Sequence, residues 1–217
     1  DPEARQFLQT VVVIGSGPSG CEMAGAASRM LRWSLKDAYQ QLDPTKTRIL
    51  LIDPGEKVLR SMPEELSKEA LQALQKAGVE FLQQSRVQSM RPGEVVVNTP
   101  HGEQCIRAAT VIWTAGVRAS HLGQALEAAT GCSVDRGGRV VVAPDFSIAS
   151  HPEIRIAGDL CSYSHTQDGH PLPGMAAPAK QAGSFIGKDI AAVVAGRPRP
   201  KFRYLDLGSM AIVDGSS

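Results

Sequence analysis

Apolar and polar residues alternate along the chain in a pattern that predicts a parallel α/β sheet. The unbroken apolar run at residues 11–14 is typical of a strand buried on both faces. A glycine-rich turn follows it, and an amphipathic helical pattern then continues to about Tyr39. Further apolar runs alternate with amphipathic segments, the order expected for strands connected by helices. We predict strands at 11–14, 47–53, 79–82 and 109–116, and helices at 21–39, 63–77, 122–129 and 176–195.

Residues 86–106 carry short alternating runs separated by turns, and this pattern predicts a β-meander that covers one edge of the parallel sheet. Ser61 is predicted to cap the helix that opens at Pro63, and Gly78 to end it. The three strands of the meander are expected at 86–90, 94–98 and 103–106. Four later strands are expected at 138–142, 146–148, 154–159 and 202–208.

The turn after the first strand has the pattern Gly-x-Gly-x-x-Gly, formed by Gly15, Gly17 and Gly20 with Pro18 and Ser19 between the last two. In a dinucleotide-binding unit the first glycine permits a tight turn and the second lets the backbone approach a pyrophosphate. The third lets the helix pack closely on the strand. The motif alone is weak evidence in a chain with 21 glycines. The strand before it and the helix after it are the required context, and together they predict a dinucleotide fold.

Asp53 ends the second predicted strand, at the place where an acid hydrogen-bonds the adenosine ribose and disfavours a 2′-phosphate. Its separation from Gly20 is longer than the usual spacing of about 20 residues, which a longer first helix and the loop that follows would explain. Two alternatives remain open. Asp53 could simply form the turn before Pro54-Gly55, and Arg60 or Lys57 could bind a 2′-phosphate if Asp53 turned away.

Composition excludes several classes of protein. A formal net charge of +1 argues against nucleic-acid binding through bulk electrostatics. No apolar stretch reaches the roughly 18 residues that span a bilayer, and the first residues do not resemble a signal peptide. The four cysteines form no Cys-x-x-Cys pair and are expected to be reduced thiols in a cytoplasmic protein; no metal site is predicted. Both ends of the chain suggest a piece of a longer protein.

At Trp113-Thr114-Ala115-Gly116-Val117 and Ile156-Ala157-Gly158-Asp159 the chain resembles the flavoprotein reductases with two dinucleotide-binding folds. Within them it is most similar to the type II NADH dehydrogenases, which pass electrons from NADH through FAD to a membrane quinone. The resemblance covers nearly the whole chain, and its motifs occur in the family's order. It rests on residues 15–25, 52–59, 111–119 and 171–183, and on 202–211, which is similar to the segment before the family's membrane-binding C-terminus.

The resemblance implies a role for each matching residue. Gly15, Gly17 and Gly20 would hold the NADH pyrophosphate, and Asp53 the ribose. Glu22 would face the nicotinamide–flavin contact and assist proton transfer, unless it is a first-turn carboxylate that stabilises the helix. Gln181 would contact the quinone, unless it is a solvated helix residue. The remaining cofactor-binding positions implied for NAD(H) and FAD are Pro18, Ser19, Ala115, Gly116, Gly158, Asp159, Ala176 and Ala177.

Two departures from the family pattern bear on function. Ala177-Pro178 stands where many members have Ala-Gln, which leaves the quinone undefined. The chain also begins where the NAD-binding domain should begin, so we expect a fragment that lacks the first FAD-binding half and the C-terminal membrane helices. The implied fold is α/β. A Rossmann-like NAD-binding domain with a β-meander (1–116) would precede the returning C-terminal part of an FAD-binding domain (117–200) and a truncated membrane-proximal segment (201–217).

The resemblance implies that the full-length protein is an FAD-dependent NADH:quinone oxidoreductase on the cytoplasmic face of the membrane. A homodimer is compatible with this resemblance. It would reach the membrane surface only through a C-terminus outside this sequence. One alternative is a related flavin reductase with a soluble acceptor such as a ferredoxin. Another is that this chain alone is a dinucleotide-binding module without turnover.

Overall fold

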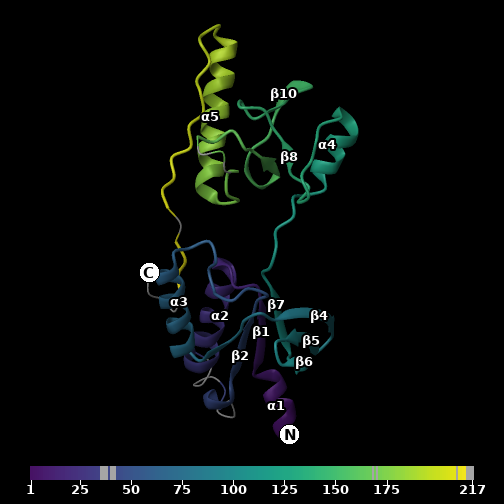
Figure 1. Cartoon of the computed structure of the whole chain (residues 1–217), viewed down its shortest axis with the longest axis vertical. Helices are drawn as coiled ribbons and strands as arrows, with labels where there is room; N and C mark the ends of the chain where they lie inside the picture. Colours follow the sequence, from purple (N-terminus) through teal and green to yellow (C-terminus); the bar gives the residue numbers. More distant parts are fainter. Residues whose placement is uncertain (35–38, 40–42, 168, 170, 209, 214–217) are drawn as a thin grey trace. The chain divides into compact units, whose positions relative to one another are not determined.

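The structure is a computed structural model that describes residues 1–34, 39, 43–167, 169, 171–208 and 210–213. The chain forms two compact units, shown in Figure 1. Unit 1 comprises Asp1–Gly116 with the described part of 209–217, and unit 2 comprises Val117–Gly208. The predicted membrane-proximal segment 201–217 is thus divided between the two units. Each unit is described by itself below.

Unit 1 is built on a four-stranded parallel sheet with the strand order β3-β2-β1-β7. The central strand β1 is buried along its whole length, because the apolar run predicted at 11–14 lies between two strands and two covering layers. Ile14 pairs with Ile52 on one side and with Trp113 on the other, so the carboxyl ends of three strands align. The strands are β1 (Thr10–Ile14), β2 (Arg48–Ile52), β3 (Val79–Leu82) and β7 (Thr110–Trp113).

Two helices cover one face of this sheet (Figure 1). They are α2 (Pro18–Arg29) and α3 (Glu64–Lys76). Side chains that alternate along the strands point to this face, among them Val11 and Val13 of β1. Val213 is buried in the same core, with Ala211 packed against it, so the described residues 210–213 complete the helix side of unit 1.

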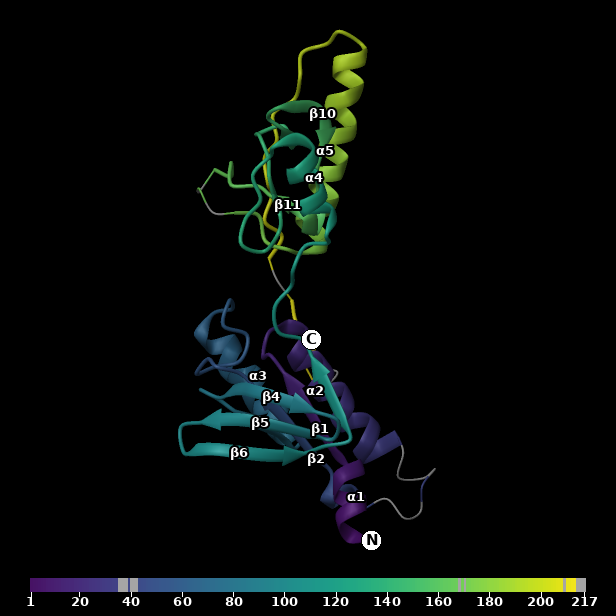
Figure 2. The same cartoon turned by 90° about the vertical axis from the view of Figure 1, so that its right-hand side faces the viewer.

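The antiparallel meander β4-β5-β6 covers the opposite face of the sheet, where Val12 and Ile14 pack on Val95 and Val97 (Figure 2). The prediction that it covers an edge was wrong. The reason is in β1 itself, because a strand that is apolar at every position must have both faces covered. The meander strands are β4 (Arg86–Arg91), β5 (Glu94–Thr99) and β6 (Gly102–Arg107).

Several boundaries in unit 1 differ from those predicted. A helix α1 (Pro2–Leu8), which the sequence analysis did not identify, precedes β1. After α2 the chain continues as a π-helix at Met30–Ser34, and the rest of the predicted helix lies largely outside the described residues. Pro63, not Ser61, precedes α3, and no side chain caps it, whereas Gly78 ends it as predicted with φ +80°. Strand β7 lies at a sheet edge and is only partly buried.

The strands of unit 2 are short, and its longest element is the helix α5 (Ala176–Val194). Two short strand pairs accompany it, β9 with β10 antiparallel and β8 with β11 parallel. The strand predicted at 154–159 ends at Arg155, and Gly158–Leu160 is a 3₁₀-helix; residues 202–208 are not a strand. The other elements are α4 (Leu122–Thr130), β8 (Val140–Val141), β9 (Ser147–Ile148), β10 (His151–Arg155) and β11 (Cys161–Ser162).

Four aromatic rings form the centre of the unit 2 core. Phe146 is fully buried and stacks on Tyr163 with ring centroids 4.3 Å apart. Phe202, from the segment after α5, meets Phe146 edge-to-face at 4.8 Å and Phe185 at 5.4 Å. The segment beyond the last helix is therefore held in unit 2 by an apolar anchor.

Replacing Phe202 with alanine is expected to lower the free energy of unfolding by about 2 kcal/mol. Removal of a fully buried Phe costs roughly 3–5 kcal/mol, and this ring is half-buried. Urea unfolding of the 217-residue chain would measure the change. Leu205→Ala is the control, because the Leu205 side chain is exposed; equal losses in both variants would contradict the anchoring role of Phe202.

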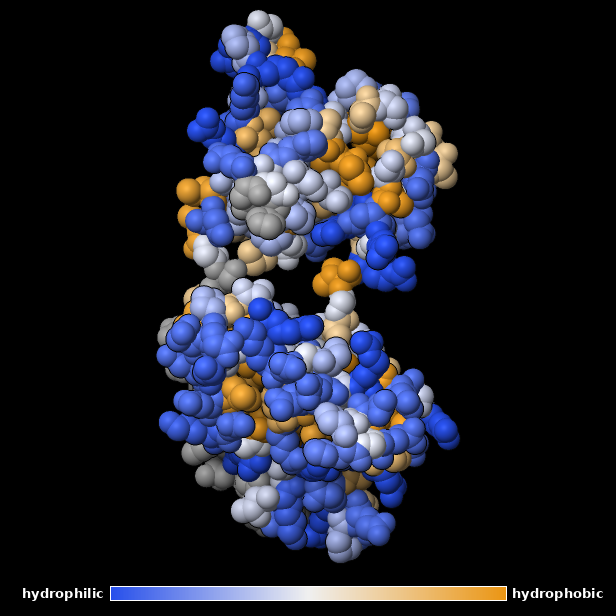
Figure 3. Space-filling model, in the orientation of Figure 1, coloured by the Kyte–Doolittle hydropathy of each residue, from blue (hydrophilic) through white to orange (hydrophobic). Residues whose placement is uncertain are grey.

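The described surface is largely polar. In the view of Figure 3, apolar side chains form small separate groups between charged ones. Among the described residues, no helix combines the length and the apolar character that crossing a membrane requires.

Candidate functional site

The glycine-rich turn joins the carboxyl end of β1 to α2, and packing within unit 1 requires two of its three glycines. Gly15 has φ +101°, and a Cβ placed on it would lie 2.9 Å from the Ala115 Cα atom. A Cβ on Gly20 would lie 1.7 Å from the Gly15 carbonyl oxygen. These glycines therefore let the strand, the helix and the end of β7 approach closely.

Gly17 is different, because no atom lies within 4 Å of the position that its Cβ would take. It precedes Pro18, the first residue of α2, and no side chain caps this helix. Pro18 and Ser19 are exposed beside it. Since the first N–H groups of a helix favour an anion, the open side of the turn is suited to a phosphate that approaches the backbone closely.

Asp53 lies at the carboxyl end of β2, beside this turn, and its side chain is only 6% exposed. The Ser16 N–H donates to its Oδ2 atom at 2.8 Å, and the Gly55 N–H donates to its Oδ1 atom at 2.7 Å. The predicted turn-forming role is thus present in the structure. The two bonds also fix the glycine-rich turn against the β2 loop.

The loop after β2 forms a further hydrogen bond with the glycine-rich turn. The Leu59 N–H donates to the Ser16 carbonyl oxygen at 2.8 Å, and Leu59 is buried with φ +49°, an uncommon conformation for a branched residue. The Ser67 hydroxyl of α3 donates to the Val58 carbonyl oxygen at 2.6 Å. Cys21 lies beneath this turn, and burial raises the pKa of its thiol to about 12. It is therefore a packing residue.

The end of β7 closes the turn from the other side. The Thr114 hydroxyl donates to the Ile14 carbonyl oxygen at 2.8 Å, and the Trp113 indole N–H donates to the Ala115 carbonyl oxygen at 2.6 Å. Gly116 follows with φ +74°. The sequence-predicted residues Ala115 and Gly116 therefore lie at the carboxyl edge of the parallel sheet, next to Gly15.

Glu22 is half-buried on α2, beyond its first turn, because this helix begins at Pro18. The proposed alternative, a first-turn carboxylate, is therefore wrong. Its Oε1 atom accepts a hydrogen bond of 3.2 Å from the Ile212 N–H. The carboxylate thus contacts the returning segment 210–213 through this oxygen.

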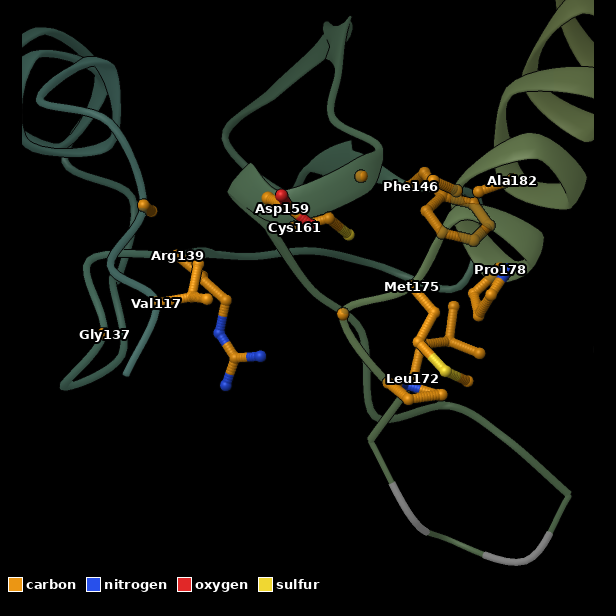
Figure 4. A pocket seen from close by; sticks show the side chains of 15 residues that line it. Val117, Gly137, Arg139, Phe146, Asp159, Cys161, Leu172, Met175, Pro178 and Ala182 are labelled. Atoms are coloured by element: carbon orange, nitrogen blue, oxygen red, sulfur yellow. The ribbon is translucent and has the colours of Figure 1, made fainter. Parts of the chain in front are cut away.

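Unit 2 contains a cavity of about 200 Å³, shown in Figure 4. Gly158 and Asp159 line it from the 3₁₀-helix, as do Pro178 and Ala182 from α5. Arg139 projects from the opposite side, and Asp135 holds it through an ion pair of 2.7 Å. The cavity therefore combines an apolar wall with one negatively charged side chain, Asp159, and one positively charged side chain, Arg139.

The start of α5 lies beside this cavity. Met175 precedes the helix and lines the cavity, and no side chain caps it. Ala176 and Ala177 form the first positions of the helix, so their N–H groups belong to its uncapped end. Gln181 lies one turn further, and its amide is paired with the Leu205 backbone at 2.8 and 3.0 Å. It is neither a simply solvated residue nor free to bind a ligand without breaking this pair.

A profile of the pyridine nucleotide-disulphide oxidoreductases matches residues 2–183, most of the chain. The chain belongs to this family. The sequence analysis correctly predicted its α/β fold. It also correctly predicted membership among the flavoprotein reductases with two dinucleotide-binding folds. The match includes the turn at 15–20, Asp53, and the residues around Asp159.

Individual members of the family are similar over nearly the whole chain. The Mycobacterium tuberculosis type II NADH:quinone oxidoreductase Ndh is 37% identical over 98% of it. The solved structure of Plasmodium falciparum NDH2 with NADH shares the fold, with a TM-score of 0.86 at 14% identity over 98% of the chain. The ferredoxin reductase for the CYP199A2 system of Rhodopseudomonas palustris also shares it, with a TM-score of 0.66 at 18% identity over 92% of the chain.

The chain spans only part of these proteins, namely 46% of the Mycobacterium enzyme, 57% of the Plasmodium chain and 45% of the Rhodopseudomonas chain. The sequence-predicted site residues are correspondingly divided between the two units. Unit 1 brings together the glycine-rich turn, Asp53, Glu22, Ala115 and Gly116. Unit 2 brings together Gly158 and Asp159 at the cavity, with Ala176, Ala177 and Gln181 on α5.

Sequence reasoning did not single out several residues that line the cavity in unit 2. Arg139, Cys161 and Met175 line the cavity, but a turn arginine, a single cysteine and a residue before a helix carry no distinctive pattern. Burial raises the pKa of the Cys161 thiol to about 12, so it is not a nucleophile at neutral pH. The four cysteines are free thiols, and no group of His, Cys, Asp and Glu side chains within the described ranges could hold a metal ion.

Proposed function

We propose that the chain binds NADH through unit 1 and part of FAD through unit 2, as a portion of a type II NADH:quinone oxidoreductase. The observation that carries this proposal is Gly17, whose missing side chain leaves open space at an uncapped helix start. Packing within the chain does not explain a glycine there, whereas a pyrophosphate in contact with the backbone does. The 37% identity to the Mycobacterium enzyme supports the choice of reaction.

In this proposal each unit 1 residue has a physical task. The α2 N-terminus binds the pyrophosphate, with Gly15 and Gly20 fixing the turn and Pro18 and Ser19 flanking it. Asp53 accepts hydrogen bonds from the adenosine ribose in addition to those it already accepts. Ala115 and Gly116 leave room at the carboxyl edge of the sheet.

Unit 2 fits a portion of FAD. A cavity of about 200 Å³ is smaller than the whole cofactor but suits its ribitol–pyrophosphate part, with Asp159 as an acceptor for hydroxyl groups. The uncapped N–H groups of Ala176 and Ala177 favour negative charge near the flavin ring. When bound, the flavin would accept hydride from NADH and pass two electrons to the acceptor. The Glu22 carboxylate would assist proton transfer at the nicotinamide–flavin contact.

The proposal extends to the electron acceptor and to the location of the whole protein. A quinone is the acceptor named for the Mycobacterium relative. Gln181 would reach a quinone only by releasing the Leu205 backbone. The whole protein would lie at the cytoplasmic face of the membrane, attached peripherally, and could be a homodimer.

The 217-residue chain is expected to bind NADH, measured by calorimetry, and to retain flavin absorbance after incubation with FAD and removal of free flavin. An artificial acceptor would then test NADH oxidation. Binding of NADH without retention of flavin would support the alternative of a dinucleotide-binding module. Absence of NADH binding would contradict the proposal, and turnover with a ferredoxin but not with a quinone would favour the soluble-acceptor reductase.

A further inference from the structure

The two outer strands of the meander, β4 and β6, differ in how they end the sheet. Strand β4 carries a bulge between Val87 and Ser89, and a bulge at an edge hinders pairing with a further strand. Strand β6 pairs with β5 in unbroken register from Gly102 to Arg107. Five of its six residues are exposed, and Figure 2 shows it at the outer edge of the meander. The edge at β6 is therefore regular and open to a further strand.

The backbone of β6 turns alternate residues away from β5. The Ala108 N–H donates to the Gly93 carbonyl oxygen at 3.1 Å, and hydrogen-bonded pairs alternate along an antiparallel ladder. The even-numbered residues of β6 therefore bond β5, whereas the N–H and C=O groups of Glu103, Cys105 and Arg107 face outward. Within the described part of the chain, no backbone hydrogen bond from another element reaches these three residues.

A surface recess of about 600 Å³ borders this edge. Cys105 and Arg107 line it on the β6 side, and Arg48 and Glu80 line it on the other. Because Arg48 and Glu80 pair with each other at 3.0 Å, their charges are already satisfied. The recess thus leaves the outward backbone groups of β6 accessible and brings no uncompensated charge against them.

The charged side chains of β6 are complementary to those of a second, antiparallel β6. Glu103 and Arg107 are both exposed, and each lies two positions from Cys105. Arg107 is 70% exposed and only loosely engaged within the chain, since its guanidinium lies 4.0 Å from the Glu3 carboxylate. In antiparallel pairing about Cys105, each Glu103 lies opposite the Arg107 of the other copy, and Cys105 lies opposite Cys105.

This register also agrees with the backbone. Each of its pairs joins residues whose N–H and C=O groups face outward, so each pair can exchange two hydrogen bonds. A slip by one residue would place outward groups opposite inward ones, and a slip by two would separate Glu103 from Arg107. Charge and hydrogen bonding therefore select the same alignment.

We propose that two copies of this chain associate through β6, which pairs with β6 of the second copy and joins the two meanders into one continuous sheet. The same surface serves both copies, as a two-fold axis at Cys105 requires. The inference is independent of dinucleotide binding. One strand from each copy is a small contact beside the roughly 1,600 Å² of a standard interface, so we expect a weak dimer with a micromolar dissociation constant.

Sedimentation of the 217-residue chain over a series of concentrations tests this inference, and we expect a monomer–dimer equilibrium. Glu103→Arg should weaken dimerisation by about tenfold or more, because it places like charges opposite each other at two symmetric positions. Adding Arg107→Glu to the same chain restores opposite charges and should recover most of the affinity. Only an interface in which these two residues face each other predicts this recovery.

Two further variants sharpen the test. Arg86→Glu makes a charge change of the same size on the bulged strand β4 and should change the dissociation constant by less than about twofold. Diamide, which takes up the two protons and two electrons released when two thiols form a disulfide, should cross-link the dimer. Cys105→Ser should abolish this cross-link, because Cα atoms about 5.5 Å apart in such a pair allow a disulfide.

A chain that sediments as a monomer even at millimolar concentration would overturn the inference. So would a dimer that Glu103→Arg leaves unchanged, a double variant as weak as the single one, or a cross-link that persists in Cys105→Ser.

Discussion

Replacing Gly20 with alanine is expected to lower the stability of unit 1 by about 3 kcal/mol or more and to abolish NADH binding. The new Cβ atom would lie 1.7 Å from the Gly15 carbonyl oxygen, a backbone atom that cannot rotate away. The strand and helix must then separate, at the upper end of the cost of overpacking. Urea unfolding and calorimetry with NADH would measure the two effects.

Gly17→Ala is the matched control in the same turn. Nothing in the chain lies within 4 Å of its added Cβ, and its φ of −70° suits any residue, so stability should change by less than about 1 kcal/mol. NADH binding should nevertheless weaken at least about tenfold, because the methyl group occupies the approach to the pyrophosphate. Unchanged NADH affinity in Gly17→Ala would remove the main support for dinucleotide binding at this turn.

Asp189→Ala is expected to lower the free energy of unfolding by about 2–3 kcal/mol, because it removes charge-assisted hydrogen bonds from a buried carboxylate. The Asp189 side chain is 1% exposed and accepts hydrogen bonds from the Arg199 guanidinium at 2.5 and 2.7 Å. Arg155, 13% exposed, lies 3.5 Å away. Both arginines also contact Asp145, so the four side chains join α5 to the segments on either side of it.

The same network should make unfolding of unit 2 sensitive to acid. Hydrogen bonding to Arg199 lowers the pKa of Asp189 below its ordinary value. Its contribution to stability is therefore complete above the ordinary carboxyl pKa of about 4 and is lost as the pH falls below it. The dependence of stability on pH between about 2 and 5 should flatten in Asp189→Ala. Glu80→Ala, which breaks the exposed pair with Arg48, is the control and should leave the profile unchanged.

Hydrophobic pattern and glycine spacing were sufficient to predict the centre of the fold. The run at 11–14 is apolar at every position, which allows only a strand covered on both faces, and the structure has it so. The meander's position was wrong because alternation identifies strands but does not say which surface they cover. Gly20 could be predicted, since its role depends on neighbours close in sequence.

The side-chain partners at the site could not be predicted, because they come from distant parts of the chain. Asp53 accepts a hydrogen bond from the Ser16 N–H, 37 residues away, and Gln181 is bonded to Leu205, 24 residues away. Glu22 meets Ile212, whose position depends on the course of the whole chain. Residue type indicates which chemistry these groups can offer, whereas their partners depend on tertiary structure.

The division of unit 1 into two segments constrains the order in which the protein can form. Unit 2 is continuous in sequence, but Val213 belongs to the helix-side core of unit 1. During synthesis the completion of that core by Val213 therefore waits for the whole of residues 117–208 to emerge, although its four strands are made early. Contacts so distant in sequence form slowly, and until they form, apolar surface on α2 and α3 remains open to chaperones and to aggregation.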